Sequence, residues 1–352
     1  MLWFILIACF IFCWAFASFV LGGPNLDHLD APIGEQFDSH ADDFQANKDF
    51  LKIVIGIQIK ARSTKSLKKG IAVAREFADN LSQDLNSDCA FTSVTANGVE
   101  CEWVVAPGAD PKRRILFLHG GAFIFGSPKG HRIMGHQLSH LANSAVLSVD
   151  YRMLPENKRM LASLDAQSAY HYILSNGPDG DTPLDKLLVA GDSAGGNLAL
   201  MLSGWSKNNA ARKPDGVIGF SPSLDTTLSS PTFLSNRKTD PLLGLPLGMI
   251  ARLPRALSLW FGLFSMRCNP SNTIVSPLFG ELDNLAPTLI HASSSEVLLG
   301  DAIRYTNKAK AAGSDVTLQI WKDQIHDWHL FNHQVGSGKQ AWSEIEKFIA
   351  RI

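Results

Sequence analysis

Downstream of residue 115, short apolar runs alternate with segments of helix length, and this alternation limits the fold more than any other feature. The runs cover residues 115–119, 145–150, 187–191, 217–220, 288–292 and 317–321. The helix-length segments cover residues 131–143, 161–174, 195–205, 301–312 and 339–350. Nearly continuous apolar strands separated by helices are typical of a parallel sheet that helices cover on both faces. The expected fold class is therefore α/β.

Composition excludes several classes of protein. The 352 residues are 45% hydrophobic and only 18% charged, so the chain can bury enough apolar surface to offset the entropy lost on ordering. A net charge of −1 gives no electrostatic basis for binding nucleic acid. Five cysteines are too few at this length for a disulfide-stapled scaffold, and the pairing of Cys89, Cys101 and Cys268 stays open.

The first 24 residues carry no Asp, Glu, Lys or Arg. Residues 2–21 are almost wholly apolar and, as a helix, would span the hydrocarbon core of about 30 Å. An uncleaved membrane anchor is the favoured interpretation. A cleaved signal peptide ending at the Ala15-Phe16-Ala17 sequence is the alternative. The expected location is therefore a membrane of the secretory pathway or endoplasmic reticulum, or the exterior if the leader is cleaved.

A nucleophilic serine is predicted at Ser193. The sequence GDSAG at residues 191–195 follows the apolar strand and precedes a helical segment. This is the G-x-S-x-G pattern in the strand–turn–helix context that a strained nucleophile turn requires. The alternative interpretation is a helix cap in which Ser193 only accepts a backbone N–H.

An oxyanion hole is predicted next to this serine. The apolar strand at 115–119 ends in Gly120 and Gly121, which let the backbone approach a substrate closely. We expect the N–H groups of Gly120, Gly121 and Ala194 to donate to the oxyanion.

The general base is predicted to be His326, in a short loop after the last strand. In the hydrolase arrangement the order along the chain is serine, acid, histidine. His329, three residues further on, is the alternative. Because the base must be neutral, the rate should fall as the pH drops below about 6.5.

Glu296 is the predicted acid that orients this histidine, because it lies in the loop after the strand at 288–292. Asp301 begins a helix and is interpreted as an N-terminal helix charge. Asp323 and Asp327 remain alternative acids.

These motifs together resemble the hormone-sensitive-lipase-like family of α/β-hydrolases. Motifs similar to those of the family occur in the family's order: HGGAF (119–123), VDYRMLPE (149–156), GDSAGGN (191–197), SPSLDTT (221–227), SEVLLGDA (295–302), and Trp321 followed by His326. Ala122 stands where the family has a third glycine, and Ile325 where it has a proline. The resemblance assigns Ser193, Glu296 and His326 as the triad.

The resemblance also implies a domain organisation and an activity. A leader (1–24) would precede an N-terminal helical cap segment (25–90) and a catalytic domain (91–352) with a cap insertion at about 228–272. Members that resemble arylacetamide deacetylase carry an N-terminal membrane segment. The implied activity is that of a serine carboxylesterase acting on lipophilic esters, without metal or organic cofactor. An amidase or deacetylase, and a non-catalytic ligand-binding homologue, are the alternatives.

Overall fold

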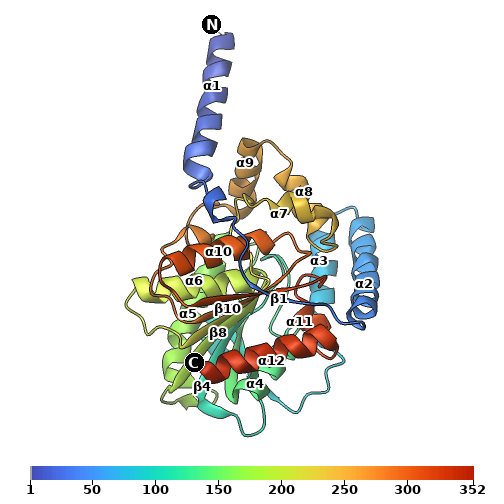
Figure 1. The fold of residues 1–352 in the computed structure, drawn as a ribbon, viewed down its shortest axis with the longest axis vertical. Coiled ribbons are helices and arrows are strands. Elements are labelled where there is room, and N and C mark those ends of the chain that lie inside the picture. Colours follow the sequence, from blue (N-terminus) through green and yellow to red (C-terminus); the bar gives the residue numbers. More distant parts are fainter. Residues whose placement is uncertain (1) are drawn as a thin grey trace.

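A nine-stranded sheet forms the centre of the computed structural model, which describes residues 2–352 (Figure 1). The strands lie in the order β1-β11-β10-β9-β8-β4-β5-β3-β2. They are β1 (Glu35–Phe37), β2 (Ala90–Ala96), β3 (Val99–Val105), β4 (Asp110–Leu118), β5 (Ser144–Val149), β8 (Lys186–Asp192), β9 (Gly216–Phe220), β10 (Thr288–Ser293) and β11 (Val316–Trp321). Neighbours from β1 to β5 are parallel, whereas β3 pairs antiparallel with β5 and β2. The mostly parallel sheet is therefore confirmed.

The strands form where the sequence is apolar because both faces of the sheet are covered. Every residue of β5, β9 and β10 is buried. The hairpin between β2 and β3 turns at Asn97 and Gly98, which both have positive φ, as the Asn-Gly signal predicts. A separate two-stranded ribbon joins β6 (Asn176–Gly177) to β7 (Gly180–Asp181).

Helices cover both faces of this sheet. The helices after the first strands are α4 (Arg132–Ala142), α5 (Arg159–Ser175), α6 (Ala194–Asn208), α10 (Leu299–Ala311), α11 (Trp328–Phe331) and α12 (Gly336–Arg351). One hydrophobic cluster joins α5, α6 and α10 to one face of the sheet, and a second cluster joins α4 and α12 to the other. The predicted arrangement in layers is therefore confirmed.

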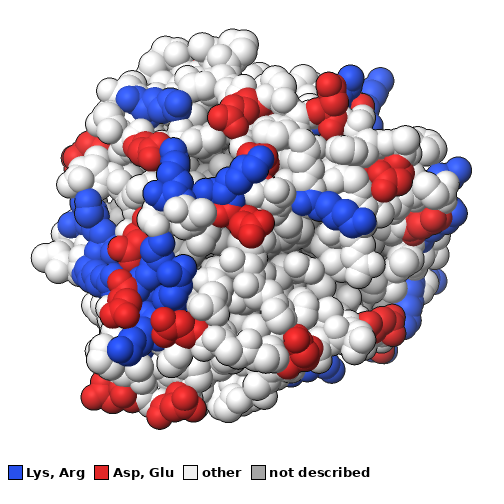
Figure 2. Space-filling model, turned by 60° about the horizontal axis from the view of Figure 1, so that its bottom comes forward, with Lys and Arg blue, Asp and Glu red and all other residues white. Residues whose placement is uncertain are grey.

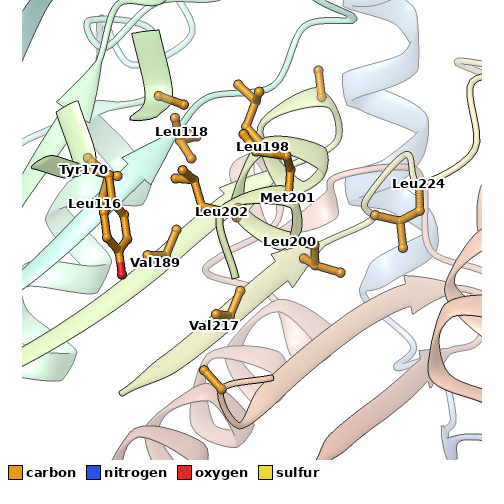
Figure 3. Packing of buried hydrophobic residues seen from close by; sticks show 14 of the residues in the cluster. Leu116, Leu118, Tyr170, Val189, Leu198, Leu200, Met201, Leu202, Val217 and Leu224 are labelled. Carbon is orange, nitrogen blue, oxygen red and sulfur yellow. The ribbon is translucent and has the colours of Figure 1, made fainter. Parts of the chain in front are cut away.

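Packing of α6 against the sheet fixes the position of the residue that precedes this helix. Leu198 and Leu202 of α6 are fully buried in the same hydrophobic cluster as Leu116, Val189 and Val217 from the strands (Figure 3). Burying one such side chain contributes about 1.5–3 kcal/mol relative to leaving it exposed. The start of α6, directly after Ser193, is thereby held against the ends of β4 and β8.

Two further groups of helices lie outside these layers. They are α2 (Asp43–Ser63) and α3 (Leu67–Asp79) between β1 and β2, and α7 (Thr232–Ser235), α8 (Gly244–Ala251) and α9 (Arg255–Met266) after β9. Short turns of other helix types are η2 (Asp27–Leu29), η3 (Asn236–Lys238) and η4 (Pro277–Phe279). Arg75 of α3 donates to the carbonyls of Ile124 and Leu154 (2.9 Å each). Helix α3 therefore contacts the loops at the carboxyl ends of β4 and β5.

The leader does not form the single membrane-spanning helix that its hydropathy predicts. Its predicted range, 1–24, begins one residue before the described part of the chain. Helix α1 (Leu2–Phe16) gives way to a π-helical turn, η1 (Ala17–Leu21), whose buried Ala17 and Leu21 pack against Leu259 of α9. The 15 residues of α1 extend about 22 Å, short of the roughly 30 Å of a hydrocarbon core. Among residues 2–352, no helix is both long and apolar enough to cross a membrane. The predicted localisation, which depended on such a leader, is therefore wrong.

Charge is distributed without a dominant sign on the face that Figure 2 shows. Basic and acidic side chains are interspersed there, and the largest group of basic side chains has acidic ones among them. Large areas of the same face carry no charged side chain. This pattern agrees with the net charge of −1.

Candidate active site

Ser193 occupies a strained turn between β8 and α6. Its φ of 51° and ψ of −111° lie in a region that a residue with a side chain rarely adopts. The Ser193 N–H donates to the carbonyl of Phe220 at the end of β9 (2.8 Å), which holds the turn in place. The side chain is 7% exposed. The turn therefore presents one hydroxyl in a fixed direction at the carboxyl edge of the sheet.

The glycine at the end of the GDSAG motif is required by a close approach of two chain segments. A Cβ atom at Gly195 would lie 1.8 Å from the carbonyl oxygen of Leu118, the last residue of β4. No side chain can be accommodated there without moving the backbone. Gly195 thus allows α6 to begin directly beside the end of β4.

Three side chains form a continuous hydrogen-bonded chain. The Nε2 atom of His326 lies 2.8 Å from the Ser193 Oγ, and its Nδ1 atom lies 2.7 Å from the Glu296 Oε2. All three are buried. They follow β8, β10 and β11, whose carboxyl ends meet at one edge because these strands are parallel. The structure therefore brings the three residues predicted as a triad into contact.

The loop that carries Glu296 is held by its own chain and by the segment after β9. The Glu296 Oε1 accepts the N–H of Ser293 (2.7 Å), so both carboxylate oxygens are engaged. The side-chain amide of Asn236 donates to the carbonyls of Ser294 (3.0 Å) and Glu296 (2.9 Å). The buried Asp240 accepts the N–H of Val297 (3.0 Å). The carboxylate thus has little freedom to turn away from His326.

A second carboxylate contacts the opposite nitrogen of His326. The Asp327 Oδ2 lies 3.0 Å from the His326 Nε2, the atom that also faces Ser193. Asp327 adopts a left-handed conformation (φ 56°), and its Oδ1 is buried without a hydrogen-bond partner in the protein. Sequence reasoning included Asp327 only as an alternative to Glu296. The structure instead places both acids around one imidazole.

We call Ser193, Glu296, His326 and Asp327 the Ser193 cluster. Burial alone would lower the pKa of His326, but Asp327 and Glu296 outweigh it and raise that pKa well above 6.5. Burial raises the pKa of Asp327 to about 7, against the opposing effect of His326. Both shifts favour a protonated His326–Asp327 pair over a pair that has lost its proton.

A buried ion pair lies directly behind the serine. The His131 Nε2 at the start of α4 lies 3.3 Å from the Asp192 Oδ2, and both side chains are buried. Burial alone would lower the pKa of His131, but the Asp192 carboxylate outweighs it and raises the pKa. Sequence reasoning missed this pair. An acid inside the GDSAG motif was its only signal, and the partner is 61 positions away in sequence.

The glycine loop after β4 offers free backbone donors. Among residues 2–352, no hydrogen-bond acceptor in the protein is found for the N–H groups of Gly120, Gly121 and Ala194. Gly121 has a φ of +111°, and a Cβ there would lie 2.0 Å from the carbonyl of Phe125. The hydroxyl of Tyr151 donates to the carbonyl of His119 (2.6 Å) and so supports the loop from behind.

Apart from Asp327, the alternative base and acids named from the sequence lie away from Ser193. The His329 Nε2 is 2.9 Å from the Nδ1 of His291, and burial lowers the pKa of both, that of His291 to about 3. Asp323 is exposed. Asp301 is buried and accepts the N–H groups of Leu224 and Asp225 (3.0 and 2.9 Å), so it is more than a helix-terminal charge. Neither His329 nor Asp323 hydrogen-bonds to Ser193.

Comparison with known proteins places the chain in a family. Residues 115–330 match the family model described as "alpha/beta hydrolase fold". The chain is 34% identical over 255 residues to an esterase of Acinetobacter venetianus, covering 72% of this chain and 80% of the relative. It is 31% identical to an acetyl-hydrolase of Streptomyces hygroscopicus, covering 70% and 78%.

Solved structures give the same result. The crystal structure of an esterase from the bacterial hormone-sensitive lipase family matches with a TM-score of 0.71 and 29% identity, over 86% of this chain and 97% of that one. An esterase/lipase from an uncultured bacterium matches with a TM-score of 0.70 and 33% identity, over 80% and 90%. The fold is the α/β-hydrolase fold, and the chain belongs to the hormone-sensitive-lipase-like family of α/β-hydrolases.

Proposed function

We propose that this protein is a serine carboxylesterase that hydrolyses lipophilic carboxylic esters through Ser193, His326 and Glu296. The chain is a carboxylic ester hydrolase, as its family and its esterase relatives indicate. The finer assignment depends on one observation. Two hydrogen bonds of 2.8 and 2.7 Å connect the Ser193 Oγ, His326 and Glu296 in the order that nucleophilic catalysis requires.

In the first half of the proposed reaction, the Ser193 Oγ attacks the acyl carbon of the ester. Its proton passes to the Nε2 of His326, and Glu296 stabilises the imidazolium through Nδ1–H. The N–H groups of Gly120, Gly121 and Ala194 donate to the oxyanion. One such donor is worth about 2.7–4 kcal/mol of transition-state stabilisation. His326 then gives its proton to the ester oxygen, the C–O bond breaks, and the alcohol leaves an acyl-serine.

Water completes the cycle by the same steps. His326 takes a proton from the water, whose oxygen attacks the acyl-serine, and then returns that proton to the Ser193 Oγ as the bond breaks. The carboxylic acid leaves. Side chains and backbone N–H groups provide the nucleophile, the proton transfers and the oxyanion donors, so the proposed reaction needs no cofactor or metal at Ser193.

We further propose that the helices within residues 25–90 and about 228–272 form a cap on a catalytic domain of residues 91–352, to whose sheet β1 of the first segment also belongs. Support comes from Arg75 and Asn236, which bond the two segments to the loops around Ser193. The insertion exposes apolar side chains, including Leu245, Met249 and Leu257. Such side chains suit the hydrocarbon groups of a lipophilic ester.

A series of p-nitrophenyl esters of increasing acyl length, compared with the matching p-nitroanilides, tests the proposal. We expect ester turnover and covalent labelling by a fluorophosphonate probe in the wild type. Ser193→Ala should lose both. Ser203→Ala, a buried serine in α6 whose Oγ has no partner, is the matched control and should keep both. Faster hydrolysis of the anilides would favour an amidase or deacetylase. A folded but unlabelled wild type would favour a non-catalytic homologue.

A further inference from the structure

Four side chains with metal-binding chemistry meet on the outer side of α4. Asp88 and Cys89 directly precede β2, whereas His136 and His140 belong to α4. One potential ligand atom from each lies within 4.8 Å of all the others. We call this group the Cys89 cluster. It shares no residue with the Ser193 cluster, and the proposed ester hydrolysis does not use it.

The contacts within the Cys89 cluster are short and converge. The His140 Nε2 lies 2.8 Å from the Asp88 Oδ1, and the His136 Nδ1 lies 3.9 Å from that oxygen. The Cys89 Sγ lies 3.4 Å from the His136 Nδ1. The two histidines are one helical turn apart, so their rings project from the same face of α4.

These distances are close to those of a zinc site. Tetrahedral Zn²⁺ takes thiolate sulfur at about 2.3 Å and imidazole nitrogen or carboxylate oxygen at about 2.0–2.2 Å, so neighbouring ligand atoms lie about 3.3–3.8 Å apart. Small side-chain rotations would bring the four atoms to this spacing. One cysteine, two histidines and one carboxylate are donors that zinc accepts.

An ion can reach these atoms from solvent. A surface hollow of about 480 Å³ is lined by Asn86 and Ser87 together with Asp88, His136 and His140. Cys89 does not line this hollow and is only 7% exposed, while the side chains of Asp88 and His140 are 57% and 41% exposed. The cluster thus has a buried soft ligand and an open outer side.

We propose that Asp88, Cys89, His136 and His140 bind one Zn²⁺ ion. Binding replaces the thiol proton of Cys89, which is released to solvent, so thiolate and carboxylate together neutralise the charge of the ion. All four positions of the tetrahedron are filled by protein, as in a structural zinc site rather than a catalytic one.

The ion would join two parts of the chain that are distant in sequence. On one side lies the connection from α3 to β2, and on the other lies α4. Ser82 of that connection already bonds to the start of α4, accepting the N–H of Ile133 (3.2 Å) and donating to the carbonyl of Gly130 (2.7 Å). Zinc would fasten the other end of the same connection.

The test uses the full chain without a histidine tag, stripped with a chelator and then titrated with Zn²⁺ by calorimetry and with Co²⁺ by absorption spectroscopy. We expect one ion per chain, a sulfur-to-cobalt charge-transfer band, and a melting temperature that rises with Zn²⁺ concentration. Cys89→Ser should abolish the charge-transfer band. His140→Ala should weaken Zn²⁺ binding by at least the roughly 10- to 100-fold that loss of an outer-shell partner costs.

Matched controls lie outside the cluster. Cys268→Ser and His171→Ala should leave the band, the affinity and the shift in melting temperature unchanged. If Cys89→Ser does not fold, His140→Ala still decides, because its side chain is partly exposed. No binding by the wild type would overturn the proposal. So would binding that survives both cluster variants, or binding that disappears in His326→Ala, which would place the ion at the Ser193 cluster.

Discussion

The Ser193 cluster and the Cys89 cluster are built from similar groups, yet their surroundings shift the pKa of His326 and the pKa of His136 in opposite directions. His326 is buried between Glu296 and Asp327, and these carboxylates raise its pKa well above 6.5. His136 is only partly buried, and burial together with the neighbouring His140 lowers its pKa. The carboxylates therefore outweigh burial at His326, whereas at His136 burial and His140 together outweigh the opposing effect of Asp88.

This difference has a direct consequence for the proposed catalysis. Only a neutral imidazole can accept a proton, and the raised pKa of His326 keeps this imidazole protonated to higher pH than an ordinary histidine. The ordinary histidine pKa suggests a rate that falls below about pH 6.5. The second carboxylate in the structure moves this limit to higher pH.

The largest expected effect comes from removing the nucleophile. Ser193→Ala should reduce kcat for p-nitrophenyl butyrate by roughly 10⁴- to 10⁶-fold, because residues that act as one unit fail together. Steady-state kinetics measures the loss, and Zn²⁺ titration of the same variant should be unchanged. A variant that loses Zn²⁺ binding as well would show that the two clusters are not independent.

The second largest effect on kcat is expected from removing the Glu296 carboxylate, which contacts the Nδ1 of His326. Glu296→Gln keeps the shape but removes the carboxylate, and kcat should fall by about 10³- to 10⁴-fold because the imidazolium is no longer stabilised. Glu281→Gln, at an exposed position, is the control and should retain full activity. Activity close to wild type in Glu296→Gln would mean that another carboxylate orients the base.

The pH dependence separates the two carboxylates. In the wild type, kcat/KM should rise with pH through an inflection above 6.5, because the raised pKa of His326 keeps the base protonated until then. Asp327→Asn removes the carboxylate beside Nε2, which lowers the pKa of His326 and moves the inflection to lower pH. The exposed Asp323→Asn, in the same loop, should leave the profile unchanged. An inflection that stays in place in Asp327→Asn would exclude Asp327 as the cause.

The smallest effect on catalysis is expected at the Cys89 cluster. Removing the ion with a chelator, or replacing His140 with Ala, should lower the melting temperature measured in Zn²⁺ and leave kcat nearly unchanged. Differential scanning fluorimetry and ester kinetics on one preparation provide both readings. A large fall in kcat would mean that α4 transmits strain from the cluster to His131 and Asp192.

Local patterns in the sequence were sufficient for part of this molecule. The GDSAG motif is contiguous, so strand, turn and helix at Ser193 could be predicted from a few neighbouring residues. The acid was harder to choose, since Glu296, Asp323 and Asp327 all lie in loops near the base. Only the three-dimensional arrangement shows that Glu296 faces Nδ1 and that Asp327 faces Nε2.

Contacts between distant segments were not visible in the sequence. Strand β1 has three residues and no apolar run, and it forms because its backbone pairs with β11. Asp88 and Cys89 are 47 or more positions from His136, so no spacing pattern indicated their cluster. The membrane-anchor prediction for the leader was wrong for a related reason. Hydropathy records how apolar the segment is, but not that the helix changes type after Phe16 and packs against α9.

Asn236 and Asp240 bond to the Glu296 loop, so the segment proposed as a cap would both select the substrate and hold the proposed acid in place. If residues 228–272 were exchanged with those of a relative to alter the accepted esters, the new segment would also have to supply these two side chains. Without Asn236 and Asp240, the exchanged segment could fit a new ester, but the Glu296 loop would lack the hydrogen bonds that hold it in place. Under this proposal, variation of specificity in this chain would be limited by the need to keep Asn236 and Asp240.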